Sequence, residues 1–205
     1  MRRSFVLIIG ILAAHGAPAS ADIVYDNISA NNWQSSLFSE DEYADDTTLS
    51  TGAGTIIRQV EIGVLRNPAL AGPYSGTMTV RLWADAGGTP GALLGTSSVP
   101  LTLTDNVPHI IAASFNSVVA PGATIWTGVQ FTFTTQLGAG IVEGIAAPSV
   151  GSSTSLRARH YPDLTWGVSS VGNSNEFIRI NTVPSPSGLA MLGLALAAAA
   201  RRQRG

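Results

Sequence analysis

Five carboxylates fall within seven residues in the run from Glu40 to Asp46. Hard cations such as Ca²⁺ prefer several oxygen ligands, so Asp45 and Asp46 with nearby backbone carbonyls form a candidate structural calcium site. The run lacks the ligand spacing and the glycine of an EF-hand loop. A solvated acidic loop before a strand therefore accounts for it better, and calcium, the only cofactor considered, remains the second interpretation.

Candidate residues for catalysis are few. The chain has no cysteine, and between its terminal segments only His109 and His160 offer an imidazole. Without a Gly-x-Ser-x-Gly or His-Glu-x-x-His motif, both histidines are expected to pack or to face solvent. Glycoside hydrolysis needs two carboxylates roughly 5 to 10 Å apart in space, and no pair stands out in the sequence. We therefore expect no enzymatic activity, with a small glycoside-cleaving enzyme as the third interpretation.

Tryptophan side chains offer a different chemistry, because indole rings exposed on a sheet can stack on sugars. Trp83 and Trp126 are out of phase with the apolar residues of their strands, which predicts that both lie on the solvent-facing surface. The competing interpretation is that both rings pack beneath loops or between strand edges. A carbohydrate-binding module with exopolysaccharide as its partner is therefore the main alternative function.

The residues that must position these side chains, 22–182, alternate between apolar and polar with a period of two. The clearest alternations are at Val60–Val64, Met78–Leu82, Val99–Leu103, Val129–Phe133 and Leu156–His160. Further short strands are expected at Ile23–Asn27, His109–Phe115, Gly140–Ile145 and Glu176–Asn181. About eight to ten strands with turn-rich links predict an all-β fold, a single antiparallel two-sheet sandwich of jelly-roll type.

One of these links, Asp85–Gly91, shows how turn residues separate the strands. Its glycines at 87, 88 and 91 are expected to supply positive φ angles in the loop between two strands. Residues 22–182 together are long enough to bury one hydrophobic core without disulfides.

Charge is distributed unevenly along the chain. All eleven basic residues are arginine, and five of them lie within five residues of a terminus. The segment between the ends therefore has six arginines against thirteen acidic residues, a formal charge of -7. An acidic surface repels polyanions, so nucleic acid is excluded as a partner.

Residues 1–21 have the pattern of a secretory signal peptide. Arg2 and Arg3 precede an apolar helical stretch, Ser4–Ala14, and Ala19 and Ala21 form a small-x-small cleavage site. The alternative, an N-terminal membrane anchor, is disfavoured because 11 apolar residues span only about 16 Å as a helix. The pattern predicts the secretion translocon and signal peptidase as partners.

Residues 183–205 contain a proline pair, an apolar segment and a basic tail. Pro184 and Pro186 end the preceding strand, and Leu189–Ala200 is apolar on all sides before the terminal arginines. This helix would be about 18 to 20 Å long, short of an ordinary membrane span. We expect transient membrane insertion with the arginines on the cytoplasmic side.

The order Val183-Pro184-Ser185-Pro186-Ser187, then Gly188–Leu194, then an arginine cluster resembles the PEP-CTERM sorting signal of exopolysaccharide-producing bacteria. The resemblance implies that an exosortase-like enzyme recognises the proline motif, cleaves near it and releases the protein to the exterior. Ser185 stands where the family has glutamate, so the enzyme is either a standard exosortase or a variant that accepts Pro-Ser-Pro. A plain C-terminal membrane anchor is the alternative.

The central part has a second resemblance. The run Tyr43–Leu49 and the run Val80–Gly95 look like the β-sandwich ectodomains found ahead of such tails, which include the choice-of-anchor domains. The two resemblances together imply an exported, non-enzymatic structural or matrix-associated protein. It is expected at the cell surface or in the extracellular matrix after C-terminal processing.

Overall fold

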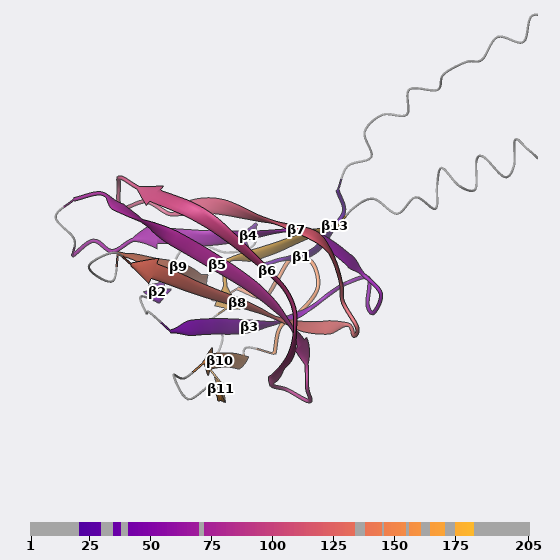
Figure 1. Ribbon diagram of the computed structural model, residues 1–205. Coiled ribbons are helices and arrows are strands. Elements are labelled where there is room, and N and C mark those ends of the chain that lie inside the picture. The colour runs from indigo at the N-terminus through magenta and orange to yellow at the C-terminus, as the bar shows by residue number, and fades with distance from the viewer. Residues whose placement is uncertain are drawn as a thin grey trace, which may run out of the picture.

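Figure 1 shows the computed structural model of the chain, with its two sheets packed face to face. The structure describes residues 21–29, 35–37, 41–69, 72–133, 138–144, 146–154, 156–160, 165–170 and 175–182. The predicted signal helix, with Ala19, and the predicted sorting signal, with Pro184, Ser185 and Pro186, lie outside these residues. Ala21, the other residue of the predicted cleavage site, is described and exposed.

The described residues form strands and no helix, as the period-two pattern predicts. Within these ranges there is accordingly no helix that could cross a membrane. The strands are β1 (Ile23–Asp26), β2 (Ser35–Leu37), β3 (Glu42–Thr48), β4 (Ile56–Arg66), β5 (Tyr74–Asp85), β6 (Pro90–Leu103), β7 (His109–Val119), β8 (Thr124–Phe133), β9 (Ala139–Gly144), β10 (Leu156–His160), β11 (Trp166–Ser170), β12 (Asn175–Glu176) and β13 (Ile178–Thr182).

The strands make two antiparallel sheets. Sheet A has the order β1-β13-β4-β9-β12, with β7 paired to β4 and β2 paired to β9. Sheet B has the order β11-β10-β3-β8-β5-β6. The predicted all-β, two-sheet antiparallel architecture is therefore confirmed, and its strands cover most of the sequence from Asp22 to Thr182.

Inward-facing apolar side chains fill the space between the sheets. Val60, Ile62 and Val64 point inward from β4 of sheet A and are fully buried. Met78, Val80 and Leu82 do the same from β5 of sheet B. Because side chains alternate between the two faces of a strand, the residues between these positions lie on the outer faces.

Three strands lie where the sequence pattern predicts none: β2, β3 and β11. The largest error concerns the acidic run, for which the sequence predicts a solvated loop. Glu42–Thr48 is instead a central strand of sheet B, and most of its side chains are buried. The predicted turn at Asp85–Gly91 is correct for Gly87 and Gly88, which have φ angles of 77° and 89°. Gly91 instead lies inside β6, where a Cβ would come within 2.8 Å of Ala86 Cβ.

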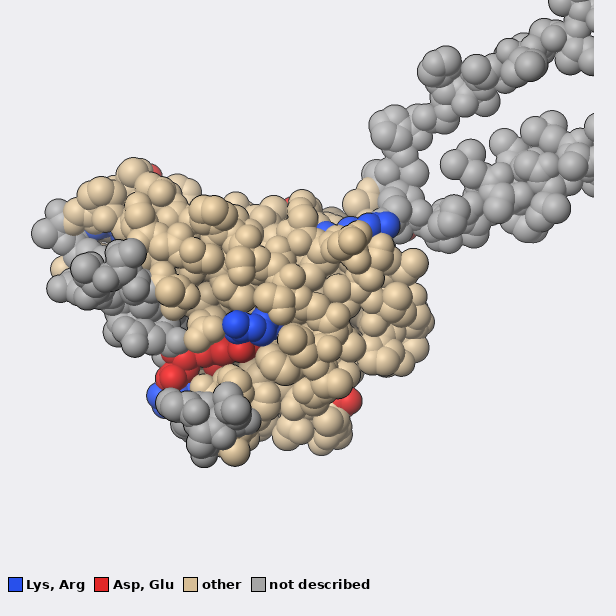
Figure 2. All heavy atoms as spheres, in the orientation of Figure 1, with Lys and Arg blue, Asp and Glu red and all other residues tan. Residues whose placement is uncertain are grey.

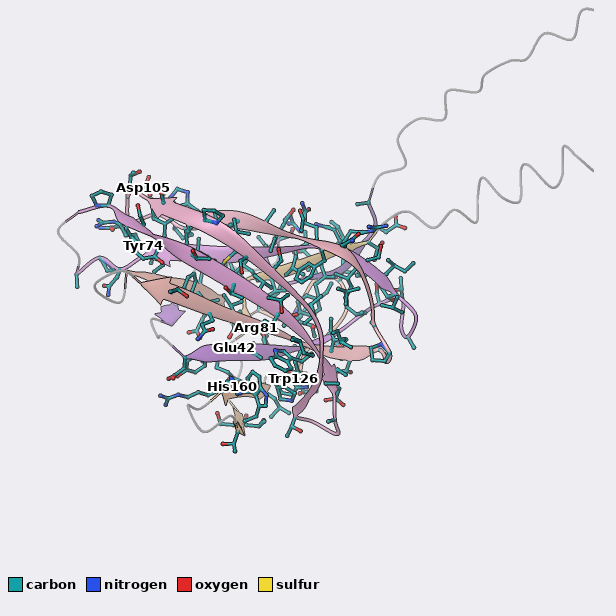
Figure 3. All side chains as sticks on the ribbon, in the orientation of Figure 1. Glu42, Tyr74, Arg81, Asp105, Trp126 and His160 are labelled. Carbon is teal, nitrogen blue, oxygen red and sulfur yellow. The ribbon has the colours of Figure 1, made fainter. Side chains whose placement is uncertain are left out.

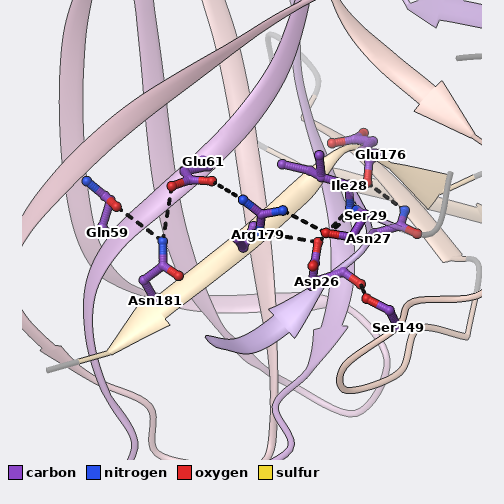
Figure 4. Close-up of polar contacts among 10 residues, drawn as sticks. All are labelled: Asp26, Asn27, Ile28, Ser29, Gln59, Glu61, Ser149, Glu176, Arg179 and Asn181. Carbon is purple, nitrogen blue, oxygen red and sulfur yellow. Dashed lines mark hydrogen bonds and ion pairs between the residues drawn. The ribbon is translucent and has the colours of Figure 1, made fainter. Parts of the chain in front are cut away.

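A polar network covers part of the outer face of sheet A (Figure 4). Arg179 of β13 donates to Glu61 of β4 at 2.9 Å and to Ser29 at 2.8 Å, and its Nε lies 3.4 Å from Asp26 Oδ1. Burial acts to raise the pKa of Asp26, but hydrogen bonds from Ser29 and Ile28 and the Arg179 charge outweigh it and lower that pKa. The network therefore ties β13 to β4 by a charge-assisted hydrogen bond and to β1 by an ion pair.

The two ends of the sandwich lie side by side. Ile23 at the start of β1 pairs with Asn181 at the end of β13, and Thr182 donates its backbone N–H to Asp22 at 2.9 Å. In Figure 1 these strand ends lie at the upper right, whereas β10 and β11 lie at the bottom. The segments before residue 22 and after residue 182 therefore join the sandwich at one place in sheet A.

Replacing Arg179 by alanine tests the network. Removing the guanidinium leaves Glu61 and the buried Asp26 without their cation, so we expect urea unfolding to show a loss of about 2 kcal/mol. Arg58→Ala is the matched control, because Arg58 is an exposed arginine on the same strand as Glu61. Equal losses for the two variants would contradict a stabilising role for the network.

Candidate functional site

The outer face of sheet B has a floor of small residues where β10, β3 and β8 lie side by side. Ala158 pairs with Ala44, and Ala44 pairs with Gly128, so these three positions form one row across the sheet. Ala44 and Ala158 are fully buried, which means that larger side chains cover the row. The small residues make room for bulky side chains from neighbouring positions.

Glu42 is the carboxylate that lies over this floor. It is 3 % exposed and accepts hydrogen bonds at 2.8 Å from Trp83 Nε1 and from an Arg81 guanidinium nitrogen. A Cβ at position 128 would overlap Glu42 Oε1 and would lie 3.1 Å from Trp83 Nε1. Gly128 is therefore required for the carboxylate and the indole to meet, and Arg81 balances the buried charge.

Three rings gather beside the carboxylate, and we call Trp83, His160 and Trp166 the aromatic group. The Trp83 and Trp166 ring centroids are 5.4 Å apart in an edge-on arrangement, and His160 stacks on Trp166 at 4.7 Å. All three rings are half-buried, so each keeps part of its surface open to solvent. Figure 3 shows His160 just below Glu42 and Arg81, on the side of β10. The contacts of Trp166 with Trp83 and with His160 hold the three rings in one arrangement.

Trp126 lies on the predicted outer face of sheet B. The prediction that it is exposed to solvent is wrong, because its side chain is fully buried. It pairs with Trp83 and Asp46 on the neighbouring strands, and it packs with Ala44, Ala158, Leu156 and Val168. Its Nε1 donates to Asp85 Oδ1 at 2.9 Å. A second apolar cluster on the outer face thus removes Trp126 from solvent, and only Trp83 of the predicted pair can contact a ligand.

Near the middle of the visible face, one basic group lies beside a row of acidic atoms (Figure 2). Further charged atoms lie toward the edges of this face, and most of the rest is uncharged. Figure 3, in the same orientation, labels Arg81 and Glu42 in this area. The Arg81 side chain is 26 % exposed and also donates to Gln130 at 3.1 Å. The site therefore combines half-exposed rings with a fixed set of polar groups.

Asp45 and Asp46, the predicted calcium ligands, point to opposite faces of β3 and do not form one site. The Asp46 carboxylate accepts four hydrogen bonds, from Ser153 Oγ, the backbone N–H and hydroxyl of Thr154, and the backbone N–H of Leu156. Asp46 is thus fully used in holding the segment before β10. Among the described residues there is no group of three or more His, Cys, Asp or Glu side chains suited to a metal ion.

Asp45 belongs instead to a buried acidic group between the sheets, formed with Glu176, Tyr25 and Arg157. Asp45 Oδ2 accepts the backbone N–H of Glu176 at 3.0 Å, while Asp45 Oδ1, both Glu176 carboxylate oxygens and Tyr25 Oη have no hydrogen-bond partner. Arg157 Nε lies 3.5 Å from Glu176 Oε1, and Arg157 also pairs with Glu143. This group joins β3 of sheet B to β12 of sheet A across the interior.

Burial raises the pKa values of the acidic side chains in this group. Loss of hydration raises the pKa of Glu176 to about 7 despite the nearby Arg157 charge. The same loss of hydration, with the Glu176 charge beside it, raises the pKa of Asp45 well above its usual value. Burial and the surrounding carboxylates also raise the pKa of Tyr25. A net negative charge is therefore costly here, and the group favours bound protons.

The histidines pack or face solvent as predicted. His160 lies against Trp166, with its Nδ1 3.9 Å from Glu42 Oε2, and His109 is bonded to Asp105 at 2.7 Å on the surface. The sequence pattern singled out neither Glu42 nor Arg81 as a site residue. Arg81 and Trp83 are two apart on one strand and so share a face, which is the one signal that could have placed them together.

No protein-family model, curated protein or solved structure matches the chain. The site is therefore interpreted from its own geometry.

Gly128→Ala tests the arrangement of Glu42 over the sheet. The added methyl group must displace the carboxylate or the sheet, so we expect a loss of about 1 to 3 kcal/mol in urea unfolding. Because Trp83 loses its acceptor, tryptophan fluorescence should also shift to the red. Gly122→Ala is the control, since its Cβ would meet its nearest atom, Thr124 O, at an ordinary 3.7 Å. A native fluorescence spectrum in Gly128→Ala would contradict the proposed contact.

Glu176→Gln tests the buried acidic group. An acid whose pKa is raised by folding binds more protons in the folded state, so stability falls as pH rises from 4.5 to about 7 and is then constant. We expect Glu176→Gln to weaken this fall and to be more stable than the parent at pH 8, on the order of 2 kcal/mol. Urea unfolding at pH 4.5, 6 and 8 measures the effect. A Glu176→Gln variant whose stability falls with pH as steeply as the parent's would contradict the raised pKa of Glu176.

Proposed function

We propose that the chain is an exported, non-enzymatic protein of the bacterial surface or extracellular matrix, and that its sandwich attaches to exopolysaccharide through the aromatic group on sheet B. The half-exposed rings of Trp83, His160 and Trp166 beside the bonded Glu42 carboxylate carry the binding part of the proposal. Export and C-terminal processing rest on the two terminal sequence patterns.

The placement of the chain ends supports processing without damage to the sandwich. The last strand, β13, ends at Thr182, just before the Pro184-Ser185-Pro186 motif. Cleavage near that motif by an exosortase-like enzyme leaves every described strand in place. The start of β1 lies beside the end of β13, so signal peptidase and the exosortase-like enzyme would act at the same end of the domain.

The order of the strands supports a jelly-roll-like sandwich as the finer description of the fold. Successive strands pass from one sheet to the other at β2 to β3, β3 to β4, β4 to β5, β6 to β7, β7 to β8, β8 to β9, β9 to β10 and β11 to β12. In such an arrangement each sheet is built from distant parts of the chain, so its outer face is a stable surface on which to hold binding side chains.

Two features of the site favour binding over hydrolysis. Both Glu42 oxygens are already engaged, one by Trp83 and the other by Arg81, so the buried carboxylate holds protein side chains in place. The Trp83 indole is fixed by a hydrogen bond and a ring contact, so little side-chain entropy is lost when a sugar stacks on it. A rigid ring beside hydrogen-bonding groups is suited to saccharides.

The export part is tested by mass spectrometry of the native C-terminal peptide in cells with and without the exosortase-like enzyme. We expect a terminus between Pro184 and Ser187 that is lost when the enzyme is deleted. An intact Gly205 in the membrane fraction of both strains would instead identify a tail-anchored protein and would overturn the processing proposal.

The binding part is tested by retention of purified protein on the exopolysaccharide of the producing cells. Trp83→Ala removes the fixed indole, and we expect about tenfold weaker binding, equivalent to roughly 1.4 kcal/mol. Trp166→Ala should act in the same direction. Ile110→Ala is the control, because Ile110 is a large exposed apolar residue on sheet A. Circular dichroism melts establish that each variant is folded, and parental binding by both folded tryptophan variants would contradict the proposal.

A further inference from the structure

The outer face of sheet B continues beyond the aromatic group as a surface of hydroxyl side chains, which we call the hydroxyl face. Thr79 pairs with Ser98 and Ser75 pairs with Thr102, and each pair has its hydroxyls in contact, at 3.1 and 3.4 Å. These residues face outward because Met78 and Val80 of β5 and Leu101 of β6 face the core. The hydroxyl face is formed by Ser75, Thr77, Thr79, Thr96, Ser98 and Thr102.

The hydroxyl face carries little charge. Along β5 from Ser75 to Trp83 and along β6 from Thr96 to Thr102, Arg81 is the one charged residue, and its guanidinium is bonded to Glu42 and Gln130. Figure 2 shows the same region of the molecule as mainly uncharged surface. An anionic polymer would find no excess of positive charge here and would approach a domain with a formal charge of -7.

The hydroxyl face and the aromatic group are continuous. Arg81 and Trp83 follow Thr79 on the same face of β5, and Arg81 pairs with Thr96 across the sheet. From Ser75 to Trp83 the strand rises about 26 Å, which is long enough for several sugar units in an extended chain. Thr96, Ser98 and Thr102 are exposed, so their hydroxyls can donate to and accept from a ligand.

We propose that the ligand of sheet B is a neutral, extended polysaccharide that lies along β5 and β6, with one sugar ring against Trp83 and Trp166 and the following units on the hydroxyl face. This inference rests on the proposed function and adds the chemical class of the polymer and its path. Neutral sugars present many hydroxyls and no charge, so they match a surface of serine and threonine side chains ending in aromatic rings.

The experiment measures binding isotherms of the full exported domain with two neutral polymers, cellulose and curdlan, with the anionic polymer alginate, and with the producing cells' exopolysaccharide. We expect binding to at least one neutral polymer and none to alginate. Ser98→Glu places a charge in the middle of the hydroxyl face and should weaken neutral binding at least tenfold. Ser114→Glu is the matched control, because Ser114 is an exposed strand serine on the outer face of sheet A.

The outcomes separate this inference from the proposed function. Equal or tighter binding of alginate overturns the neutral class while polysaccharide binding stands. Neutral binding that is lost in Trp83→Ala but unchanged in Ser98→Glu confines the ligand to the aromatic group and overturns the extended path. Binding of none of the four polymers overturns both proposals. Parental melting temperatures for Ser98→Glu and Ser114→Glu establish that the comparison concerns binding.

Discussion

The hydrogen bonds to the Glu42 carboxylate are the interaction on which the outer face of sheet B depends. One oxygen holds the Trp83 indole and the other holds Arg81, and both contacts need the space left by Gly128. Trp83 in turn supports Trp166, which stacks with His160 of the neighbouring strand. A buried carboxylate is costly without such partners. The same bonds that compensate for its burial therefore also fix the rings that a ligand would contact.

The interior between the sheets contains a contrasting group of acids. Asp45 and Glu176 are also buried, yet most of their carboxylate oxygens have no hydrogen-bond donor, and the cation near them, Arg157, is shared with Glu143. The cost of burial raises the pKa of both acids here, whereas at Glu42 two hydrogen-bond donors offset that cost. This difference separates two of the three acids of β3 by role: Glu42 organises a surface, while Asp45 links the two sheets through the Glu176 backbone.

The sequence predicts a strand correctly where one face of the strand is buried and the other is exposed to solvent. The period-two segments Val60–Val64, Met78–Leu82 and Val129–Phe133 correctly predict β4, β5 and β8, because the described apolar side chains of each segment face the core. β3 was missed because three of its seven residues are acids, and the partners that compensate for their burial are distant in the sequence. Arg81 and Trp83 hydrogen-bond to Glu42, the Glu176 backbone to Asp45, and Ser153 to Asp46. Trp126 shows the same limit: its side of the sheet follows from the local period, but its burial depends on β10, which no local pattern brings to β3. Local periodicity therefore predicts which face a side chain takes, and only the tertiary pairing decides what covers it.

The two sheets contain the residues of the two parts of the proposed function separately. Both chain ends belong to sheet A, where β1 and β13 pair, and the Arg179 network fastens those strands to β4. The aromatic group and the hydroxyl face belong to sheet B, whose strands contain neither end. β13 ends at Thr182, so the proposed cleavage beyond it would leave the described strands of sheet B in place. With the proposed processing end on one sheet and the proposed binding surface on the other, processing would leave that surface already formed.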